Sequence, residues 1–299
     1  MSVFFDITHS THYRYAQPVA LGLHRVLFRP RDSHDLRVLA TDLQVYPPPQ
    51  DVRLVQDAYS NSVALIQPQS PATEFRVDCH FSVEHTGTRA LDFALDARAQ
   101  SFPFSYDAEE RLVLAPYLQP YYDDPDGRLR RWATQFIAIQ QPTGTRELLV
   151  DMTQCIRNTF AYLARTDEGV QTPYETLYLQ RGTCRDFATL MVEAIRQLGF
   201  AARFVSGYLY TPALDLGPGM LSYPGSTHAW VQVYLPSAGW IEFDPTNGIV
   251  GTRDLVRVAV ARDPRQAIPL HGTYLGPADA FVGMDVSINV VSVSEEARA

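Results

Sequence analysis

The sequence predicts an α+β protein, with a β-rich N-terminal part followed by a part that mixes helices with a sheet. Two observations support this fold class. Residues 1–100 contain short segments rich in β-branched and aromatic residues, separated by turn signals, without a helical pattern. Beyond residue 125, apolar residues recur at helical spacing, and beyond residue 200 the pattern returns to that of strands.

Residues 1–100 are predicted to form an antiparallel β-sandwich. The segments "LRVLATDLQVY" and "EFRVDCHFSVEHT" have the composition of strands, and Pro47-Pro48-Pro49 separates segments of this kind. Several short strands with turns between them are typical of a sandwich. Residues 101–125 ("SFPFSY", then "APYLQPYYDDPDG") form a connector that is too aromatic for a free linker, so we expect it to pack across the domain junction.

Residues 126–299 are predicted to form the second domain, which ends in a long strand, "DVSINVVSV". Thr145 is a candidate cap for a helix whose apolar face includes Cys155, a small hydrophobe expected in the core. The next helix begins at Thr172, which forms a capping box with Glu175.

The composition is that of an ordinary globular protein, with 299 residues, 46% of them hydrophobic and 19% charged. A net charge of −8 argues against nucleic acid as a partner, and no apolar run approaches the ~20 residues of a membrane span. The N-terminus lacks the basic and apolar regions of a signal peptide. Three distant cysteines favour a reducing compartment, so the sequence predicts a cytoplasmic protein and leaves its oligomeric state open.

The stretch "RGTCRDFATLMVEAIRQLGF", residues 181–200, predicts an amphipathic helix with a cysteine at its start. Thr183 is the expected N-cap, Cys184 falls in the first turn, and Gly199 is the expected stop. Helix N–H groups and the dipole stabilise a thiolate there, which lowers a thiol pKa from its reference of about 8.5. The alternative is a small residue at a helix start. Asp186 follows in the same turn, where a negative side chain suits the helix dipole, so capping is the favoured explanation and a catalytic role is the alternative.

The stretch "STHAWVQVYLPSAGWIEFDPTNG", residues 226–248, predicts two antiparallel strands. If both apolar sets share one face, His228 and Asp244 share the opposite face. That parity requires a loop with an odd number of residues, or a bulge. A thiol, an imidazole and a carboxylate are the groups that nucleophilic cysteine catalysis needs.

Three aromatic residues are candidates for a substrate cleft. Trp230 and Trp240 fall on the face of His228 and Asp244, although plain packing explains them equally well. Tyr223 belongs to a Gly/Pro-rich segment just before His228 that is a candidate lid. A zinc site is not expected, because three scattered ligands lack any paired spacing, and the sequence predicts no metal and no cofactor.

The two stretches resemble the core of the bacterial transglutaminase-like superfamily, which carries Gly-x-Cys-x-Asp-Phe-Ala, then Thr-His-Ala-Trp, then Trp-x-x-x-Asp-Pro-Thr. "THYRY" and "FRPRD" are similar to the β domain that often precedes this core, and "ARDPRQAIPLHGTYLG" resembles the segment that follows it. The resemblance implies a papain-like fold, with Cys184 as nucleophile, His228 as general base and acid, and Asp244 as orienting carboxylate. Arg185 stands where glutamine is also frequent, and Asp263-Pro264 departs from the pattern.

The resemblance also implies a reaction, namely acyl transfer from a peptide or carboxamide through a thioester. Water as acceptor gives a cysteine protease or amidase, and an amine gives a protein-glutamine transglutaminase. Hydrolysis is favoured because water is always available, and a peptide or protein is the expected substrate. A non-catalytic, peptide-binding scaffold of the same fold is the alternative from another class.

Overall fold

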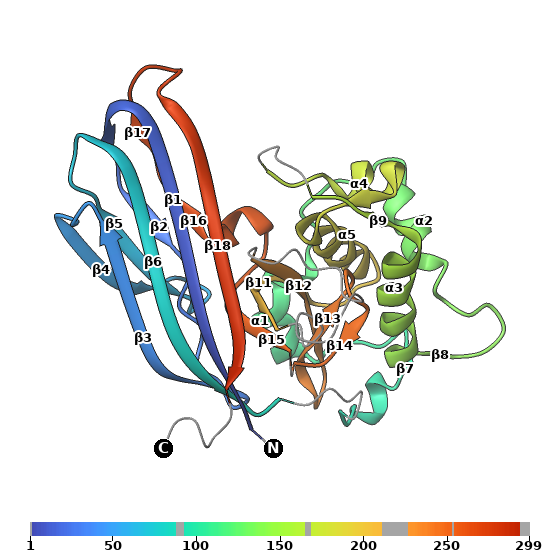
Figure 1. Ribbon diagram of the computed structural model, residues 1–299. Coiled ribbons are helices and arrows are strands. Elements are labelled where there is room, and N and C mark those ends of the chain that lie inside the picture. The colour runs from blue at the N-terminus through green and yellow to red at the C-terminus, as the bar shows by residue number, and fades with distance from the viewer. Residues whose placement is uncertain (1, 88–92, 165–168, 211–226, 253, 294–299) are drawn as a thin grey trace.

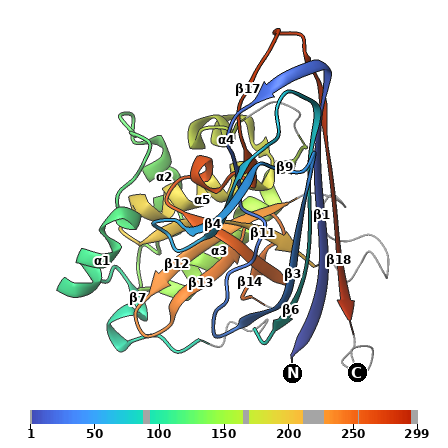
Figure 2. The same ribbon diagram turned by 90° about the vertical axis from the view of Figure 1, so that its left-hand side faces the viewer.

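The computed structural model describes residues 2–87, 93–164, 169–210, 227–252 and 254–293. Long strands form a sandwich on one side of the molecule, and a smaller sheet surrounded by helices forms the core beside it (Figures 1 and 2). The α+β fold class is confirmed, including the N-terminal antiparallel sandwich.

The sandwich consists of two antiparallel sheets. The larger has the order β17-β1-β6-β3 with β18 also on β1, and its strands are β1 (Val3–Leu21), β3 (Leu36–Tyr46), β6 (Ala72–His85), β17 (Tyr274–Leu275) and β18 (Phe281–Val293). The smaller, β16-β2-β5-β4, contains β2 (His24–Val26), β4 (Asp51–Gln56), β5 (Ser62–Gln67) and β16 (Leu270–His271). Alternate residues of β6 are buried, from Phe75 to Val83, as expected for strands with one face on a core.

The C-terminal strand belongs to the sandwich. β18 pairs with β1 along its length, from Phe4 opposite Val293 to Tyr15 opposite Phe281. The sequence analysis expected this strand but grouped it with residues 126–299. Strand composition says nothing of which free edge a strand will join, and the edge available here is that of β1.

The core sheet has the order β14-β13-β12-β11-β15. Its strands are β11 (Ala202–Leu209), β12 (His228–Leu235), β13 (Gly239–Asp244), β14 (Ile249–Val250) and β15 (Leu255–Ala261). Helix α5 (Cys184–Gln197) packs against β11 and β12, and is itself contacted by α2 (Arg128–Thr134), α3 (Thr145–Thr159) and α4 (Pro173–Leu179) (Figure 1). Short elements complete the chain: η1 (Ala97–Ala99), β7 (Ser101–Phe102), α1 (Ala108–Leu118), β8 (Thr143–Gly144), β9 (Ala161–Tyr162), β10 (Arg181–Gly182) and η3 (Pro264–Ala267).

The structure confirms one of the local helix predictions and corrects two others. The capping box of Thr172 with Glu175 is confirmed. Helix α3, however, has Gly144 as its N-cap, and Thr145 is already its first helical residue. Cys155 is half-buried, with its carbonyl bound by the Thr159 hydroxyl, because it sits beside the apolar stripe rather than within it.

The connector packs against the core, and it contains a helix that the sequence analysis missed. The Tyr106 hydroxyl donates to the carbonyl of Tyr234 at 2.8 Å, and the rings of Phe102 and Phe200 stack at 5.4 Å. Helix α1 starts with a capping box at Asp107. Its prolines and aromatic residues obscured the helical pattern.

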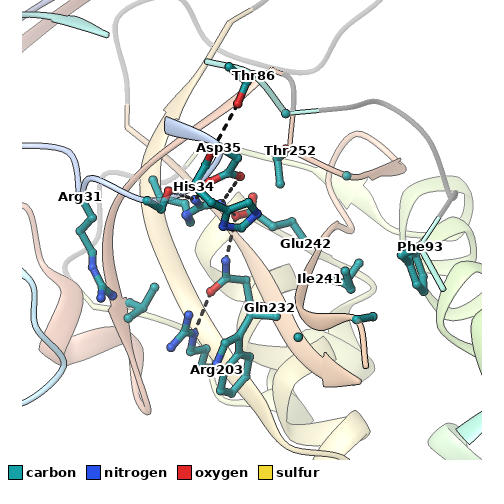
Figure 3. Close-up of a pocket in the computed structure, with 18 of the residues that line it drawn as sticks. Arg31, His34, Asp35, Thr86, Phe93, Arg203, Gln232, Ile241, Glu242 and Thr252 are labelled. Carbon is teal, nitrogen blue, oxygen red and sulfur yellow. Dashed lines mark hydrogen bonds and ion pairs between the residues drawn. The ribbon is translucent and has the colours of Figure 1, made fainter. Parts of the chain in front are cut away.

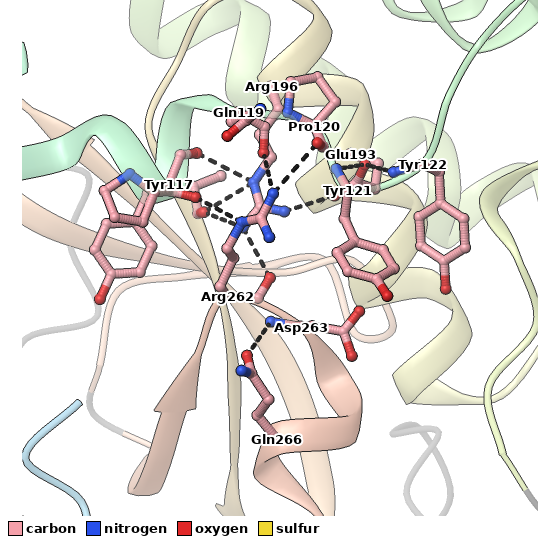
Figure 4. Close-up of polar contacts among 12 residues, drawn as sticks. Tyr117, Gln119, Pro120, Tyr121, Tyr122, Glu193, Arg196, Arg262, Asp263 and Gln266 are labelled. Atoms are coloured by element: carbon pink, nitrogen blue, oxygen red, sulfur yellow. Dashed lines mark hydrogen bonds and ion pairs between the residues drawn. The ribbon is translucent and has the colours of Figure 1, made fainter. Parts of the chain in front are cut away.

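Helix α5 is buried on every side between residues 186 and 196, rather than on one face. Two charged residues in it form a buried ion pair, with Arg196 Nη1 2.6 Å from Glu193 Oε1. Arg196 also donates to the carbonyls of Tyr117, Ala202 and Arg262 (Figure 4). Glu193 Oε2 accepts from the amides of Tyr121 and Tyr122. The pair thus fastens the connector to the C-terminal half of α5.

We expect Arg196→Leu to lower the free energy of unfolding by about 3–5 kcal/mol, because it leaves the Glu193 carboxylate buried without its cation. Urea unfolding followed by circular dichroism measures this difference. Arg14→Leu is the matched control. Arg14 pairs with Asp285 at 2.6 Å, but both side chains are about half exposed, so its loss should cost less than about 1 kcal/mol. Equal costs for the two variants would contradict the structural role of Arg196.

Candidate active site

Cys184 is the first residue of α5, and its position is fixed by the cap of that helix. Thr183 is the N-cap, as predicted. Asp186 Oδ2 accepts from the Thr183 amide at 2.8 Å and from its hydroxyl at 3.0 Å, and Oδ1 accepts from the Gln171 amide at 2.7 Å. Asp186 is therefore a capping residue, as the sequence analysis proposed. Cys184 is 7% exposed, at the end of the helix where N–H groups have no intrahelical acceptor.

His228 and Asp244 meet on adjacent strands. His228 begins β12, Asp244 ends β13, and the imidazole Nε2 lies 2.8 Å from the carboxylate Oδ2. The two strands are joined by a three-residue turn, because Leu235 pairs with Gly239. The odd loop length predicted from the parity of the two apolar sets is confirmed, since residues 236–238 form the turn.

The site buries an imidazole and a carboxylate next to each other, and each shifts the pKa of the other. Burial alone would lower the pKa of His228, but the charge and hydrogen bond of Asp244, with further contributions from a side-chain hydrogen bond to Cys184, raise it to about 10. Burial would raise the pKa of Asp244, yet His228 and further hydrogen-bond donors hold it below its usual value. An imidazolium facing a carboxylate is therefore the favoured state of the pair.

Asn247, which the sequence analysis overlooked, also binds the acid of this pair. Its Nδ2 donates to Asp244 Oδ2 at 2.8 Å, and the amides of Thr246 and Asn247 donate to Oδ1 at 2.9 and 3.3 Å. The segment after Asp244 thus folds back on the carboxylate as a turn. The segment "DPTNG" carries the signal, because Asp and Asn are typical turn residues whose side chains bind nearby backbone and side-chain groups.

Neither tryptophan lines an open cleft with His228. Trp230 is completely buried; its Nε1 donates to Glu242 Oε2 at 2.7 Å, and its ring stacks beside the His228 ring at 5.9 Å. It supports the imidazole from behind, which corrects its assignment as a cleft wall. Trp240 lines a different cavity, whose described lining residues include neither Cys184 nor His228. Tyr223 and the candidate lid, residues 211–226, lie outside the described residues.

Within the described ranges, no cluster of three or more His, Cys, Asp or Glu side chains has the geometry to hold a metal ion. No helix there combines the length and the apolar character that crossing a membrane requires.

We expect His228→Gln to flatten the pH dependence of the free energy of unfolding above about pH 6.5. The pKa of a histidine is about 6.5 in an unfolded chain, and that of His228 is about 10 in the folded protein. The stabilisation by the charged ring is complete below pH 6.5 and is lost as the pH rises toward 10, at up to about 1.4 kcal/mol per pH unit. Urea unfolding from about pH 6 to about pH 9 checks this slope.

The exposed His34 provides the control, because His34→Gln should leave the slope as in the unsubstituted protein. Parallel curves for His228→Gln and the unsubstituted protein would show that no buried imidazolium forms.

Comparisons with known proteins agree with this architecture. Residues 5–84 match the family described as the bacterial transglutaminase-like N-terminal region, and residues 130–245 match the transglutaminase-like superfamily. An uncharacterised protein of Mycobacterium tuberculosis is 29% identical over 98% of this chain and 94% of its own length. A protein-glutamine gamma-glutamyltransferase of Pseudomonas aeruginosa is 33% identical over 72 residues, which are 24% of this chain and 11% of that protein.

One solved structure shares the whole architecture. The crystal structure of a candidate cysteine protease from Cytophaga hutchinsonii superposes with a TM-score of 0.72 at 20% identity, covering 98% of this chain and 92% of that one. At this identity the likeness shows the fold. Residues 130–245 of this chain therefore carry a core of the transglutaminase-like superfamily, and residues 5–84 carry a bacterial transglutaminase-like N-terminal region ahead of it.

Proposed function

We propose that this protein is a thiol-dependent acyl-transfer enzyme that acts on a peptide or carboxamide carbonyl, and that water is its usual acceptor, as in a cysteine protease or amidase. The observation that carries the proposal is the buried His228–Asp244 pair. Interactions with Cys184, at the start of α5, add to the rise in the pKa of its imidazole. The nucleophile, the base and the orienting acid then follow one another in space, and each belongs to a different helix or strand.

The first half of the reaction follows from this order. Nε2 of His228 is engaged by Asp244, so Nδ1 is the ring nitrogen that takes the thiol proton. The sulfur of Cys184 attacks the carbonyl carbon, the C–N bond breaks, and the imidazolium returns the proton to the departing amine or ammonia. Asp244 stabilises the imidazolium throughout, and the Asn247 amide keeps the carboxylate in place.

The second half resolves the thioester. His228 removes a proton from water, the hydroxide oxygen attacks the acyl carbon, and the carbon–sulfur bond breaks to release a carboxylic acid and the thiolate, which again faces the imidazolium. The developing oxyanion in both halves would lie at the N-terminus of α5, where backbone N–H groups of the first turn are available.

Cross-linking is the second candidate, favoured by the 33% identity with a segment of a protein-glutamine gamma-glutamyltransferase. It differs only in that an amine rather than water attacks the thioester. If the protein is instead a peptide-binding scaffold without catalysis, the Cys184 thiol should be no more reactive than an ordinary thiol. The reactivity of Cys184 is therefore the first property to test. A cytoplasmic location stays a prediction.

We expect iodoacetamide at about pH 6 to alkylate Cys184 at least about tenfold faster than Cys155, because His228 supplies a cation to the thiolate. Cys155 is half-buried and is the internal control in the same molecule. Peptide mass spectrometry after timed quenching gives both rates. His228→Gln should remove the difference, and a Cys184 no faster than Cys155 would support the scaffold.

Mass spectrometry of the purified protein with mixed peptides and a primary amine should identify the reaction. Peptide cleavage, ammonia release without cleavage, and amine incorporation indicate a protease, an amidase and a transglutaminase respectively. Cys184→Ala should abolish the product, and Asp244→Asn should lower kcat about 10²–10⁴-fold, because the imidazolium loses its partner. Asp285→Asn, on the exposed part of β18, is the matched control and should leave kcat unchanged. Turnover by Cys184→Ala would refute the proposal.

A further inference from the structure

The cavity that Trp240 lines lies between the sandwich and the core sheet. Its volume is about 480 Å³. The sandwich contributes the segment around Arg31 and Asp35, and the core contributes residues of β11, β12, β13 and β15 (Figure 3). Three arginines and two buried carboxylates line it: Arg31, Arg203, Arg257, Asp35 and Glu242.

One arginine, Arg257, binds both buried carboxylates. Arg257 Nη1 lies 2.5 Å from Glu242 Oε1 and 3.1 Å from Asp35 Oδ2, and its Nη2 binds Asp35 Oδ1. Although burial would raise the pKa of Asp35, Arg257 holds it far below its usual value. Glu242 also accepts from the side chains of Trp230 and Gln232. Burial raises the pKa of Glu242, although Arg257 and the Gln232 side chain oppose that rise.

Among the described residues, neither of the other two arginines forms an ion pair with a carboxylate within 4 Å, although the charge of Asp57 partly offsets the effect of burial on the pKa of Arg31. Arg203 Nε donates to Gln232 Oε1 at 2.7 Å, and its guanidinium lies 3.9 Å from the centre of the Trp240 ring. Burial, and to a smaller extent the charges of Arg31 and Arg257, lower its pKa to about 10. Burial and then Arg257 also lower the pKa of Arg31. Figure 3 shows both side chains at the end of the cavity away from Asp35.

We propose that this cavity binds the carboxylate group of a small organic acid or of a peptide, held by Arg31 and Arg203. Planar guanidinium groups match a carboxylate with two parallel hydrogen bonds, and an anion between them would relieve their mutual repulsion. The lining holds three guanidinium groups and three carboxylates, the third being the exposed Asp32, so its charges balance. A singly charged carboxylate therefore disturbs this balance less than a dianionic phosphate does. Trp240 offers an apolar surface for the rest of the ligand.

This site is separate from the proposed acyl-transfer site, since its described lining residues include none of Cys184, His228 and Asp244. The inference goes beyond the proposed function and needs no catalysis. Isothermal titration of the full chain carrying Cys184→Ala therefore tests it independently. If that protein binds no carboxylate, the acyl-transfer proposal still stands, and an inactive enzyme can still bind one here.

The probes are acetate, butyrate and inorganic phosphate at equal ionic strength. We expect the two carboxylates to bind more tightly than phosphate, and Arg203→Gln and Arg31→Gln each to weaken binding at least about tenfold. Arg203→Lys should give an intermediate loss, because the charge remains and the second parallel hydrogen bond does not. Arg53→Gln is the matched control, because Arg53 is exposed on β4 and pairs with Asp51.

Three outcomes would overturn the proposal: no carboxylate binding, tighter binding of phosphate than of acetate and butyrate, or binding that neither Arg31→Gln nor Arg203→Gln weakens. Circular dichroism and thermal unfolding show which variants are folded. Should Arg203→Gln fail to fold, Arg31→Gln and Arg203→Lys decide the question.

Discussion

The fixed position of helix α5 is the constraint on which the candidate site depends. Asp186 caps its first turn and accepts from the Gln171 amide, which ties the start of the helix to the chain before α4. Near its other end, the buried pair of Glu193 and Arg196 binds backbone groups of the connector and of the core sheet (Figure 4). A buried ion pair serves here less as a source of stability than as a way of fixing one arrangement of three segments. Cys184 has little freedom as a result.

The partners of Cys184 depend on a second constraint, the register of β12 and β13. A slip of one residue would turn His228 and Asp244 to opposite faces of the sheet. The buried apolar residues on the other face, such as Val231, Val233 and Phe243, make that slip costly. The Trp230 ring stacks against the His228 imidazole, and its Nε1 donates to Glu242. The position of the imidazole is therefore coupled to the hydrogen bonds of Glu242.

The hydrogen-bond network around Glu242 joins the two halves of the molecule. Arg257 extends from the core sheet to Asp35 of the sandwich while also binding Glu242. A second polar link is made by His9 of β1, whose Nδ1 lies 2.8 Å from the Tyr208 hydroxyl of β11; burial lowers the pKa of His9 to about 3 and keeps the ring neutral. Because β18 returns to β1, the last strand of the chain stabilises the first domain. The sandwich and the core therefore form a continuous structure, with a charged cavity at their junction.

The sequence by itself determined what depends on neighbouring residues. Capping residues and periodicity located the start of α5 at Cys184, and the parity of the apolar residues put His228 and Asp244 on one face. Only the tertiary structure decided what depends on long-range packing. Examples are the edge that β18 joins, the burial of Arg196, the position of Trp230 behind the imidazole, and the placement of Arg31 and Arg203 in one cavity. These outcomes depend on which surfaces of distant segments fit together, and local hydrophobic patterns carry no record of that fit.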